Sequence, residues 1–222
     1  MAAPEGAGVA APERGAVAEP AAPAEGPGPV AILIGPPGAG KSTVGPLLAA
    51  RLGVGFLETD EQVEATAGKP VGDIFVEDGE AAFRALEREA VARAVANHDG
   101  VLGLGGGAVL DSGTQVLLAQ QRVVYLATGF AASAKRVGMD RPRPLLIGNP
   151  RARLRELLEQ RLPIYEELAR ITVTTDERAP DEIAADIAAQ IAGPAPAGES
   201  GGGPPGAARR GVPGERPPGA AP

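Results

Sequence analysis

The sequence predicts an α/β fold in which a five-stranded parallel sheet lies between two layers of helices. Three observations predict it. Short apolar runs alternate with stretches of helical periodicity, an order that favours a parallel sheet with helices on both faces. A glycine-rich turn directly follows the first apolar run, at the edge where ligands of open α/β sheets bind. The part of the chain with this pattern, residues 30–193, has the size of one compact domain.

The two ends of the chain have a different composition. Residues 1–29 and 194–222 together hold 14 of the 23 prolines and almost no large apolar side chains. Such segments cannot bury enough apolar surface to offset the entropy that they would lose on ordering. We therefore expect a disordered Ala/Pro/Gly-rich tail at 1–29, a single domain at 30–193 and a disordered Pro/Gly-rich tail at 194–222.

The overall composition argues against several classes of protein. The net charge of −7 disfavours a nucleic-acid-binding protein, because such a protein needs a basic surface. No run of 18 apolar residues could span a membrane, and no basic-then-apolar leader opens the chain, so we expect a cytoplasmic protein. With no cysteine and one histidine, His98, the chain cannot form thiolate or multi-histidine metal sites.

The apolar runs and the helical patterns place the elements in order. We expect a helix at 41–52, directly after the glycine-rich turn, because apolar residues recur there at helical spacing. The predicted strands are the short apolar runs at 30–34, 55–58, 101–104, 123–126 and 171–174.

The remaining segments predict the parts that cover the sheet. A mostly helical insertion at about 60–97 is long enough to form a substrate-binding cap over the carboxyl edge of the sheet. Residues 138–150 are rich in Pro, Arg and Gly and predict a mobile lid, of the kind that excludes water during phosphoryl transfer. We expect helices at 151–160, from Pro163 onward and at 180–191 to complete the domain.

Residues 35–43, with the sequence Gly-Pro-Pro-Gly-Ala-Gly-Lys-Ser-Thr, form a complete phosphate-binding loop, or P-loop. Its glycines let backbone N–H groups turn toward phosphates, Lys41 reaches the terminal phosphates, and Ser42 can ligate Mg²⁺. The helix that follows directs its positive N-terminus at the same phosphates. The loop therefore predicts a P-loop NTPase three-layer sandwich. The expected nucleotide-binding residues in it are Gly38, Ala39, Gly40, Lys41, Ser42 and Thr43.

Two carboxylates, Glu58 and Asp60, follow the second predicted strand and so should lie at the same sheet edge as the phosphate loop. Strand alternation would put both on one side of the chain. One could accept the proton of a phosphoryl acceptor, while the other holds water on Mg²⁺. The alternative is that both are solvated carboxylates at a helix start, where Asp is common.

Arginines are the second group of candidate site residues, because their planar forks match phosphate and carboxylate oxygens. The candidates are Arg84 in the cap, Arg136 before the lid, Arg141 and Arg143 within it, and Arg161 beyond it. Arg143 lies between two prolines, and a stiffened lid could deliver it onto the transferring phosphate.

A second glycine-rich segment, Gly105-Gly106-Gly107, follows the third predicted strand. Its backbone N–H groups could receive a substrate hydroxyl or carboxylate at the ligand-binding edge of the sheet. The spacing also fits a dinucleotide-binding turn, but that motif needs an acidic residue at the end of the next strand, where this chain has Thr128 and Gly129.

Together these segments resemble the shikimate kinases, small P-loop enzymes that phosphorylate the 3-hydroxyl of shikimate on the way to chorismate and the aromatic amino acids. The resemblance runs across the whole domain. The matching segments are the phosphate loop 35–43, Glu58-Thr59-Asp60, Asp73-Ile74-Phe75, Gly79-Glu80, Phe83-Arg84 with Glu87, Leu104 to Ala108, Arg143-Pro144-Leu145-Leu146, and Arg161-x-Pro163-x-Tyr165.

The resemblance implies an enzyme that converts ATP and shikimate to ADP and shikimate 3-phosphate, acting as a monomer. For the acceptor, it implies that Asp60 holds the shikimate hydroxyls and serves as the base. Gly106, between Gly105 and Gly107, would contact the substrate through its backbone. Arg84 and Arg161 would clamp the carboxylate of shikimate.

For the nucleotide, the resemblance implies that Lys41 and Arg143 meet the phosphates of ATP, with Lys41 stabilising the charge that develops during transfer. Ser42 would ligate Mg²⁺. Arg136 and Arg178 would flank the adenine.

This chain departs from the family pattern at Glu58, where the family usually has Asp. The carboxylate is retained on a longer side chain, which would still act on Mg²⁺ through water. Two alternatives stay open at this point. One is a gluconate-type or nucleotide kinase on the same fold, and the other is a nucleotide-binding regulatory module without turnover.

Overall fold

The structure, a computed structural model, describes residues 28–138 and 150–193. Within them, five strands form one parallel sheet in the order β2-β3-β1-β4-β5. The strands are β1 (Ala31–Ile34), β2 (Phe56–Glu58), β3 (Val101–Gly103), β4 (Val123–Ala127) and β5 (Ile171–Thr174). The predicted five-stranded parallel sheet is confirmed. The predicted tail at 194–222, residues 1–27 of the other tail and most of the predicted lid lie outside the described residues.

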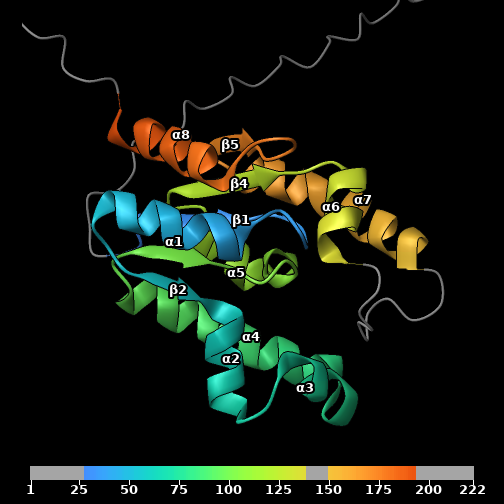
Figure 1. Cartoon of the computed structure of the whole chain (residues 1–222). Coiled ribbons are helices and arrows are strands. Elements are labelled where there is room, and N and C mark those ends of the chain that lie inside the picture. Colours follow the sequence, from blue (N-terminus) through green and yellow to red (C-terminus); the bar gives the residue numbers. More distant parts are fainter. Residues whose placement is uncertain (1–27, 139–149, 194–222) are drawn as a thin grey trace, which may run out of the picture.

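Helices cover both faces of this sheet (Figure 1). They are α1 (Lys41–Leu52), α2 (Thr59–Ala67), α3 (Val71–Glu77), α4 (Gly79–Asn97), the short 3₁₀ helix η1 (Ala108–Leu110), α5 (Ser112–Leu118), α6 (Phe130–Val137), α7 (Pro150–Leu168) and α8 (Pro180–Ala192). Helices α2 and α3 extend away from the sheet and pack on α4 (Figure 1). None of the helices in the described part of the chain is long and apolar enough to cross a membrane.

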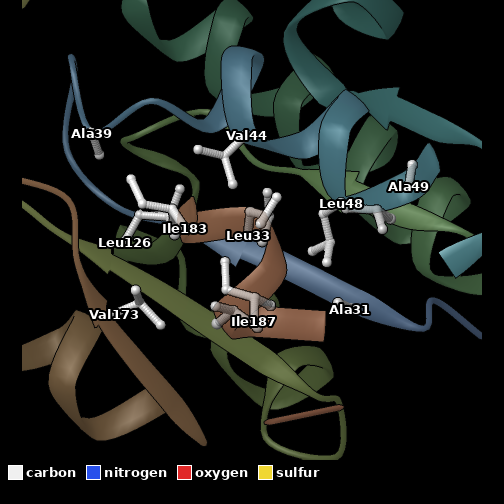
Figure 2. Close-up of a cluster of buried hydrophobic side chains, with 13 residues drawn as sticks. Ala31, Leu33, Ala39, Val44, Leu48, Ala49, Leu126, Val173, Ile183 and Ile187 are labelled. Atoms are coloured by element: carbon white, nitrogen blue, oxygen red, sulfur yellow. The ribbon is translucent and has the colours of Figure 1, made fainter. Parts of the chain in front are cut away.

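The central strand β1 is buried on both faces, as its unbroken apolar sequence requires of an inner parallel strand. Leu33 points to the face covered by α1 and α8, where it packs with Leu48 and Ile187 (Figure 2). Ile32 and its neighbours on the other face pack with side chains of α4 and α7. Each fully buried Leu or Ile stabilises the fold by about 2 kcal/mol, so the sheet is a rigid base for the loops at its edge.

The cap has a small core of its own. Val63, Ile74, Phe83 and Ala90 are buried together between α2, α3 and α4, and the rings of Phe75 and Phe83 lie 4.4 Å apart. Because α4 also contributes to the main core, this cluster holds the cap firmly beside the sheet.

Helix α7 corrects one sequence expectation. We expected a helix at 151–160 and a separate one opening at Pro163, but a single helix runs from Pro150 to Leu168. Pro163 cannot donate to the carbonyl one turn before it, that of Glu159. Both residues are exposed, so water can satisfy this carbonyl and the helix continues.

Candidate active site

The carboxyl ends of β1, β2 and β3 meet at one edge of the sheet because the strands are parallel and adjacent. The segments that follow them enclose a cavity of about 420 Å³. Its lining residues are Pro37, Gly38, Gly40, Lys41, Ser42, Thr43, Glu58, Asp60, Leu104, Gly105, Gly106 and Arg136. The structure thus brings the phosphate loop, both predicted carboxylates and the first two residues of the glycine turn (Gly105–Gly107) around one space, while Gly107, Arg84 and Arg161 are not among the lining residues.

The phosphate loop takes its shape from glycines in left-handed conformations. Gly38 and Gly40 have φ angles of 77° and 99°, which side chains other than glycine rarely adopt. Helix α1 begins directly after Gly40, with Lys41, Ser42 and Thr43 in its first turn. The free N–H groups of this turn and the positive end of the helix face the cavity, an arrangement that suits a phosphate.

Lys41 is buried at the centre of the loop. Its ammonium group donates to the carbonyls of Gly35 at 2.8 Å and Pro36 at 3.2 Å. Burial lowers the pKa of Lys41 to about 8, although the carboxylates of Asp60 and Glu58 act in the opposite direction. A desolvated ammonium group of this kind interacts strongly with any anion that enters the cavity.

Asp60 lies in the first turn of α2, not on the strand, so the strand alternation expected from the sequence does not apply to it. It still lines the cavity together with Glu58, the last residue of β2. Its Oδ1 atom is buried and has no hydrogen-bond partner among the described residues. Burial raises the pKa of Asp60, while the charge of Lys41 partly opposes the rise. A buried carboxylate with a free oxygen and a raised pKa is suited to accept a proton from a bound hydroxyl.

Ser42 and Glu58 form a pair of oxygen groups at the cavity wall. The Ser42 hydroxyl donates to Oε1 of Glu58 at 2.7 Å. Hydroxyl and carboxylate oxygens are ligands that Mg²⁺ accepts, usually one or two per protein site with phosphates and water completing the shell. Among residues 28–138 and 150–193 no group of three or more acidic or histidine side chains could hold a metal. The pair therefore fits an ion shared with a nucleotide rather than a metal held by protein alone.

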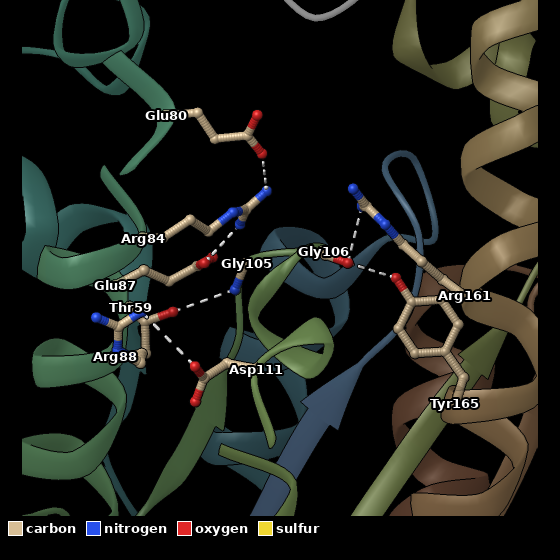
Figure 3. Close-up of polar contacts among 10 residues, drawn as sticks. All are labelled: Thr59, Glu80, Arg84, Glu87, Arg88, Gly105, Gly106, Asp111, Arg161 and Tyr165. Carbon is tan, nitrogen blue, oxygen red and sulfur yellow. Dashed lines mark hydrogen bonds and ion pairs between the residues drawn. The ribbon is translucent and has the colours of Figure 1, made fainter. Parts of the chain in front are cut away.

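Thr59 links the cap to the glycine turn. Its buried hydroxyl accepts from the backbone N–H of Gly105 at 3.1 Å (Figure 3). The same hydroxyl donates to the Gly103 carbonyl at 3.3 Å. These contacts of Thr59 were not predicted from the sequence. The only indication was its position next to Asp60, a predicted site residue. Thr59 holds the start of α2, and with it Asp60, against the glycine turn.

Arg84 reaches the glycine turn from α4. Its guanidinium donates to the buried carboxylate of Glu87 at 2.6 Å and to Glu80 at 3.3 Å (Figure 3). It lies so close to Gly107 that a Cβ atom there would overlap it. Glu87 was not assigned from the sequence, although its spacing of three residues from Arg84 on a helix is a signal for an ion pair. Burial raises the pKa of Glu87, and Arg84 opposes that rise.

Arg161 and Tyr165 reach the same turn from α7, on the opposite side (Figure 3). Arg161 Nη1 donates to the Gly106 carbonyl at 2.9 Å, and the Tyr165 hydroxyl donates to the same carbonyl at 2.6 Å. Arg161 is buried, and its Nε has no hydrogen-bond partner among the described residues. Arg84 and Arg161 thus lie on two sides of the glycine turn, Arg84 against Gly107 and Arg161 against Gly106.

Arg136 stands at the other end of the cavity, beside the phosphate loop. It donates to the Gly38 carbonyl at 3.3 Å and to both oxygens of Thr175, at 2.9 Å to the hydroxyl and 2.6 Å to the carbonyl. Arg178 is not among the cavity-lining residues; it pairs with Asp186 on α8 at 3.1 Å. Arg143, expected in the lid together with Arg141, lies outside the described residues.

Comparison with known proteins gives a consistent result. The shikimate kinase family model matches residues 37–192. The shikimate kinase of Thermobifida fusca (strain YX) is 62% identical over 163 residues, which are 73% of this chain and 95% of the relative. That of Salinispora arenicola (strain CNS-205) is 54% identical over 164 residues, 74% of this chain and 98% of the relative.

A solved structure described as shikimate kinase from Acinetobacter baumannii in complex with shikimate superimposes with a TM-score of 0.69 at 37% identity. The alignment covers 73% of this chain and 92% of that one. The fold, the phosphate loop and the sequence similarity all indicate the same family. The chain belongs to the shikimate kinase family.

Proposed function

We propose that this protein transfers the γ-phosphoryl group of ATP to the 3-hydroxyl of shikimate, giving shikimate 3-phosphate and ADP. Membership of the shikimate kinase family supports the activity. The observation that carries the proposal is the single cavity that joins the phosphate loop to Asp60, whose Oδ1 is buried and unpaired among the described residues. Donor and acceptor of a phosphoryl group could meet there with a base between them.

Phosphoryl transfer needs positioning and charge stabilisation more than covalent chemistry from the protein. At the nucleotide end, the backbone N–H groups from Gly38 to Thr43 would hold the phosphates, and Lys41 would stabilise the charge that develops during transfer. Arg136 and Arg178 would flank the adenine, and Arg143 would reach the phosphates from the lid. Of these residues, those that line the cavity are Gly38, Gly40, Lys41, Ser42, Thr43 and Arg136.

At the acceptor end, Arg84 and Arg161 would bind the carboxylate of shikimate from two sides of the glycine turn. Gly105, Gly106 and Gly107 would face the substrate through their backbone, since a side chain there would fill the space. A Cβ at Gly105 would come within 2.5 Å of Asp60 Oδ1, the oxygen that we propose receives the hydroxyl proton.

Mg²⁺ would be held by Ser42, with Glu58 acting through water. When bound, the ion neutralises part of the charge on the transferring phosphate. The contact of 2.7 Å between the Ser42 hydroxyl and Glu58 supports this assignment, because both oxygens already converge on one point of the cavity wall. By family membership, we further propose that the enzyme acts as a cytoplasmic monomer in aromatic amino acid biosynthesis.

The test is ADP release from the purified protein with Mg²⁺-ATP and, in parallel, shikimate, gluconate, AMP or no acceptor. We expect release that depends on shikimate, and a product whose mass exceeds that of shikimate by one phosphoryl group. Release with gluconate or AMP instead would assign a different acceptor. ATP binding without release in any arm would favour a regulatory module and would contradict the proposal.

A further inference from the structure

Tyr165 is buried beside the glycine turn, yet it does not line the cavity. Only 1% of it is exposed, and its ring stacks on that of Tyr125 with centroids 5.2 Å apart. Its hydroxyl is directed at the Gly106 carbonyl, to which it donates at 2.6 Å (Figure 3). Buried polar groups are normally hydrogen-bonded, and the partner of the Tyr165 hydroxyl is a residue that lines the cavity, Gly106. This contact indicates that Tyr165 helps to set the conformation of the cavity wall.

The Gly106 carbonyl receives two donors from α7. Arg161 and Tyr165 are four residues apart and therefore lie on the same face of the helix. Arg161 Nη1 donates at 2.9 Å to the oxygen that also receives the Tyr165 hydroxyl. Both lone pairs of this carbonyl are thus occupied.

Two donors on one carbonyl fix the orientation of its peptide group. In a trans peptide the N–H points opposite to the carbonyl, so the Gly107 N–H points away from α7. That direction leads toward the side on which Arg84 lies, since the Arg84 guanidinium lies against Gly107. Three consecutive glycines lose much backbone freedom when they order; a backbone bond from Ala108 N–H to the Gly105 carbonyl closes the turn, and the two donors on Gly106 add to it.

The hydrogen bonds to the Gly106 carbonyl also affect the orientation of the Arg161 side chain. Its Nη1 is engaged by the Gly106 carbonyl, and its buried Nε has no partner among the described residues. With Tyr165 sharing the carbonyl, the guanidinium is held in one orientation, and its Nε, without a partner among the described residues, remains for an anion. Without the Tyr165 hydroxyl, Arg161 alone would satisfy this oxygen and would be drawn toward it.

We infer that Tyr165 is a positioning residue for the acceptor: through the Gly106 carbonyl, it sets the glycine turn and the Arg161 guanidinium in the orientation that binds shikimate. The inference rests on the proposed function and adds a residue that does not itself touch the substrate. Burial raises the pKa of Tyr165 to about 12, so its hydroxyl remains a donor throughout the neutral range.

The experiment is Tyr165→Phe, which keeps the ring and its stacking and removes only the donor. Tyr125→Phe is the matched control: it makes the same change in the other ring of the stack, whose hydroxyl has no hydrogen bond to the glycine turn within the described residues. We expect Tyr165→Phe to raise the KM for shikimate about tenfold and to weaken calorimetric shikimate binding equally. The kcat and the KM for ATP should stay within about twofold.

Three results would overturn the inference: an unchanged KM for shikimate, an equal rise in the KM for ATP, or the same change in Tyr125→Phe. A merely structural role would affect both substrates and lower the melting temperature without this split. Failure of the wild-type protein to release ADP with shikimate would instead reject the proposed function.

A second measurement uses the wild-type chain and does not depend on how the variant folds. Hydrogen exchange of the Gly106 and Gly107 amides is followed with and without shikimate. We expect shikimate to slow exchange at Gly107, because its N–H is directed toward the side on which Arg84 lies, whereas the Gly105 N–H is already bonded to Thr59. Equal exchange rates in both conditions would contradict the inference.

Discussion

The phosphate loop and the glycine turn are both rich in glycine, but glycine is needed in them for different reasons. In the phosphate loop Gly35, Gly38 and Gly40 have φ angles of 146°, 77° and 99°, so the backbone itself demands glycine. No glycine from 105 to 107 has such a φ angle. There the demand is for space, since a Cβ at Gly105 or Gly107 would collide with side chains of the cap.

The two segments also differ in what holds them. Lys41 of the phosphate loop donates to carbonyls five and six residues before it. The glycine turn is held by hydroxyls and a guanidinium from 46, 55 and 59 residues away in the chain. Distant side chains support the phosphate loop as well, since the Ser133 hydroxyl donates to the Pro37 carbonyl at 2.7 Å and Arg136 donates to the Gly38 carbonyl at 3.3 Å. The difference is that the phosphate loop carries its own charged side chain, Lys41, within one continuous motif, whereas the charged side chains at the glycine turn come from other elements.

Asp60 lies between the nucleotide end and the acceptor end of the cavity. We expect its replacement to have the largest effect on turnover. Asp60→Asn keeps the shape of the side chain but removes the proton acceptor. We expect kcat to fall by about 10³-fold, with ATP affinity close to unchanged because the phosphate loop is intact. Steady-state kinetics and ATP titration check this. Equal loss of turnover and ATP affinity would show that Asp60 supports the fold of the cavity rather than the reaction.

Arg84 belongs to the acceptor end alone. For Arg84→Ala we expect the KM for shikimate to rise about 100-fold, because a charge-assisted contact with the carboxylate is lost. The KM for ATP should remain within about twofold. Arg88→Ala is the matched control, since Arg88 lies on the same helix, is half exposed and, within the described part of the chain, pairs only with Asp111 at 3.7 Å. A wild-type KM for shikimate in Arg84→Ala would remove Arg84 from the carboxylate site.

Gly38 belongs to the nucleotide end. Alanine at Gly38 is strained by its φ of 77°, and its Cβ would lie 2.9 Å from the Ser133 carbonyl. We expect kcat/KM for ATP to fall about 30-fold. Gly53→Ala is the control, because Gly53 has a similar φ of 69° at the end of α1 but lies outside the cavity lining. A similar loss in both variants would mean that destabilisation, not the loop, accounts for the effect.

The pKa of Lys41 predicts the pH dependence of the nucleotide end. Lys41 is charged below about pH 8 and neutral above it, and phosphate binding needs the charged form. We therefore expect kcat/KM for ATP to be level just below pH 8 and to fall about tenfold per pH unit above it. Lys41→Arg should lose this alkaline limb, because a guanidinium does not titrate there. A profile that stays level to pH 9.5 in the wild type would contradict the lowered pKa.

The strands and the phosphate loop could be predicted from the sequence because each is a continuous segment. A buried parallel strand is an unbroken apolar run, as in residues 31–34, and the phosphate loop carries its spacing within nine residues. Every predicted strand lies within one residue of the observed ends. Asp60 could be placed at the ligand-binding edge of the sheet because it follows a predicted strand, whereas the placement of Arg84 at the acceptor followed from the resemblance to a family.

The contacts of Thr59 and Tyr165 could not be predicted because each joins distant segments. A threonine after a strand is expected as a β-type residue, and a tyrosine in a helix is expected in the core. Only the packing of α2 and α7 around the glycine turn gives their hydroxyls partners. The contact of Glu87 with Arg84 is local, three residues apart on α4, and its spacing was a signal that remained unassigned. Pro163 was misplaced because proline normally ends a helix unless the freed carbonyl can reach water.

The central claim is that the phosphate loop binds the nucleotide and the glycine turn binds the acceptor independently. The most direct test measures equilibrium binding of each ligand to two glycine variants, Gly38→Ala and Gly107→Ala. ADP and shikimate are titrated separately into each by calorimetry, so turnover plays no part. We predict that Gly38→Ala weakens ADP binding and leaves shikimate binding unchanged. Gly107→Ala, whose Cβ would displace Arg84, should weaken shikimate binding and leave ADP binding unchanged. Loss of both ligands in either variant would contradict the account.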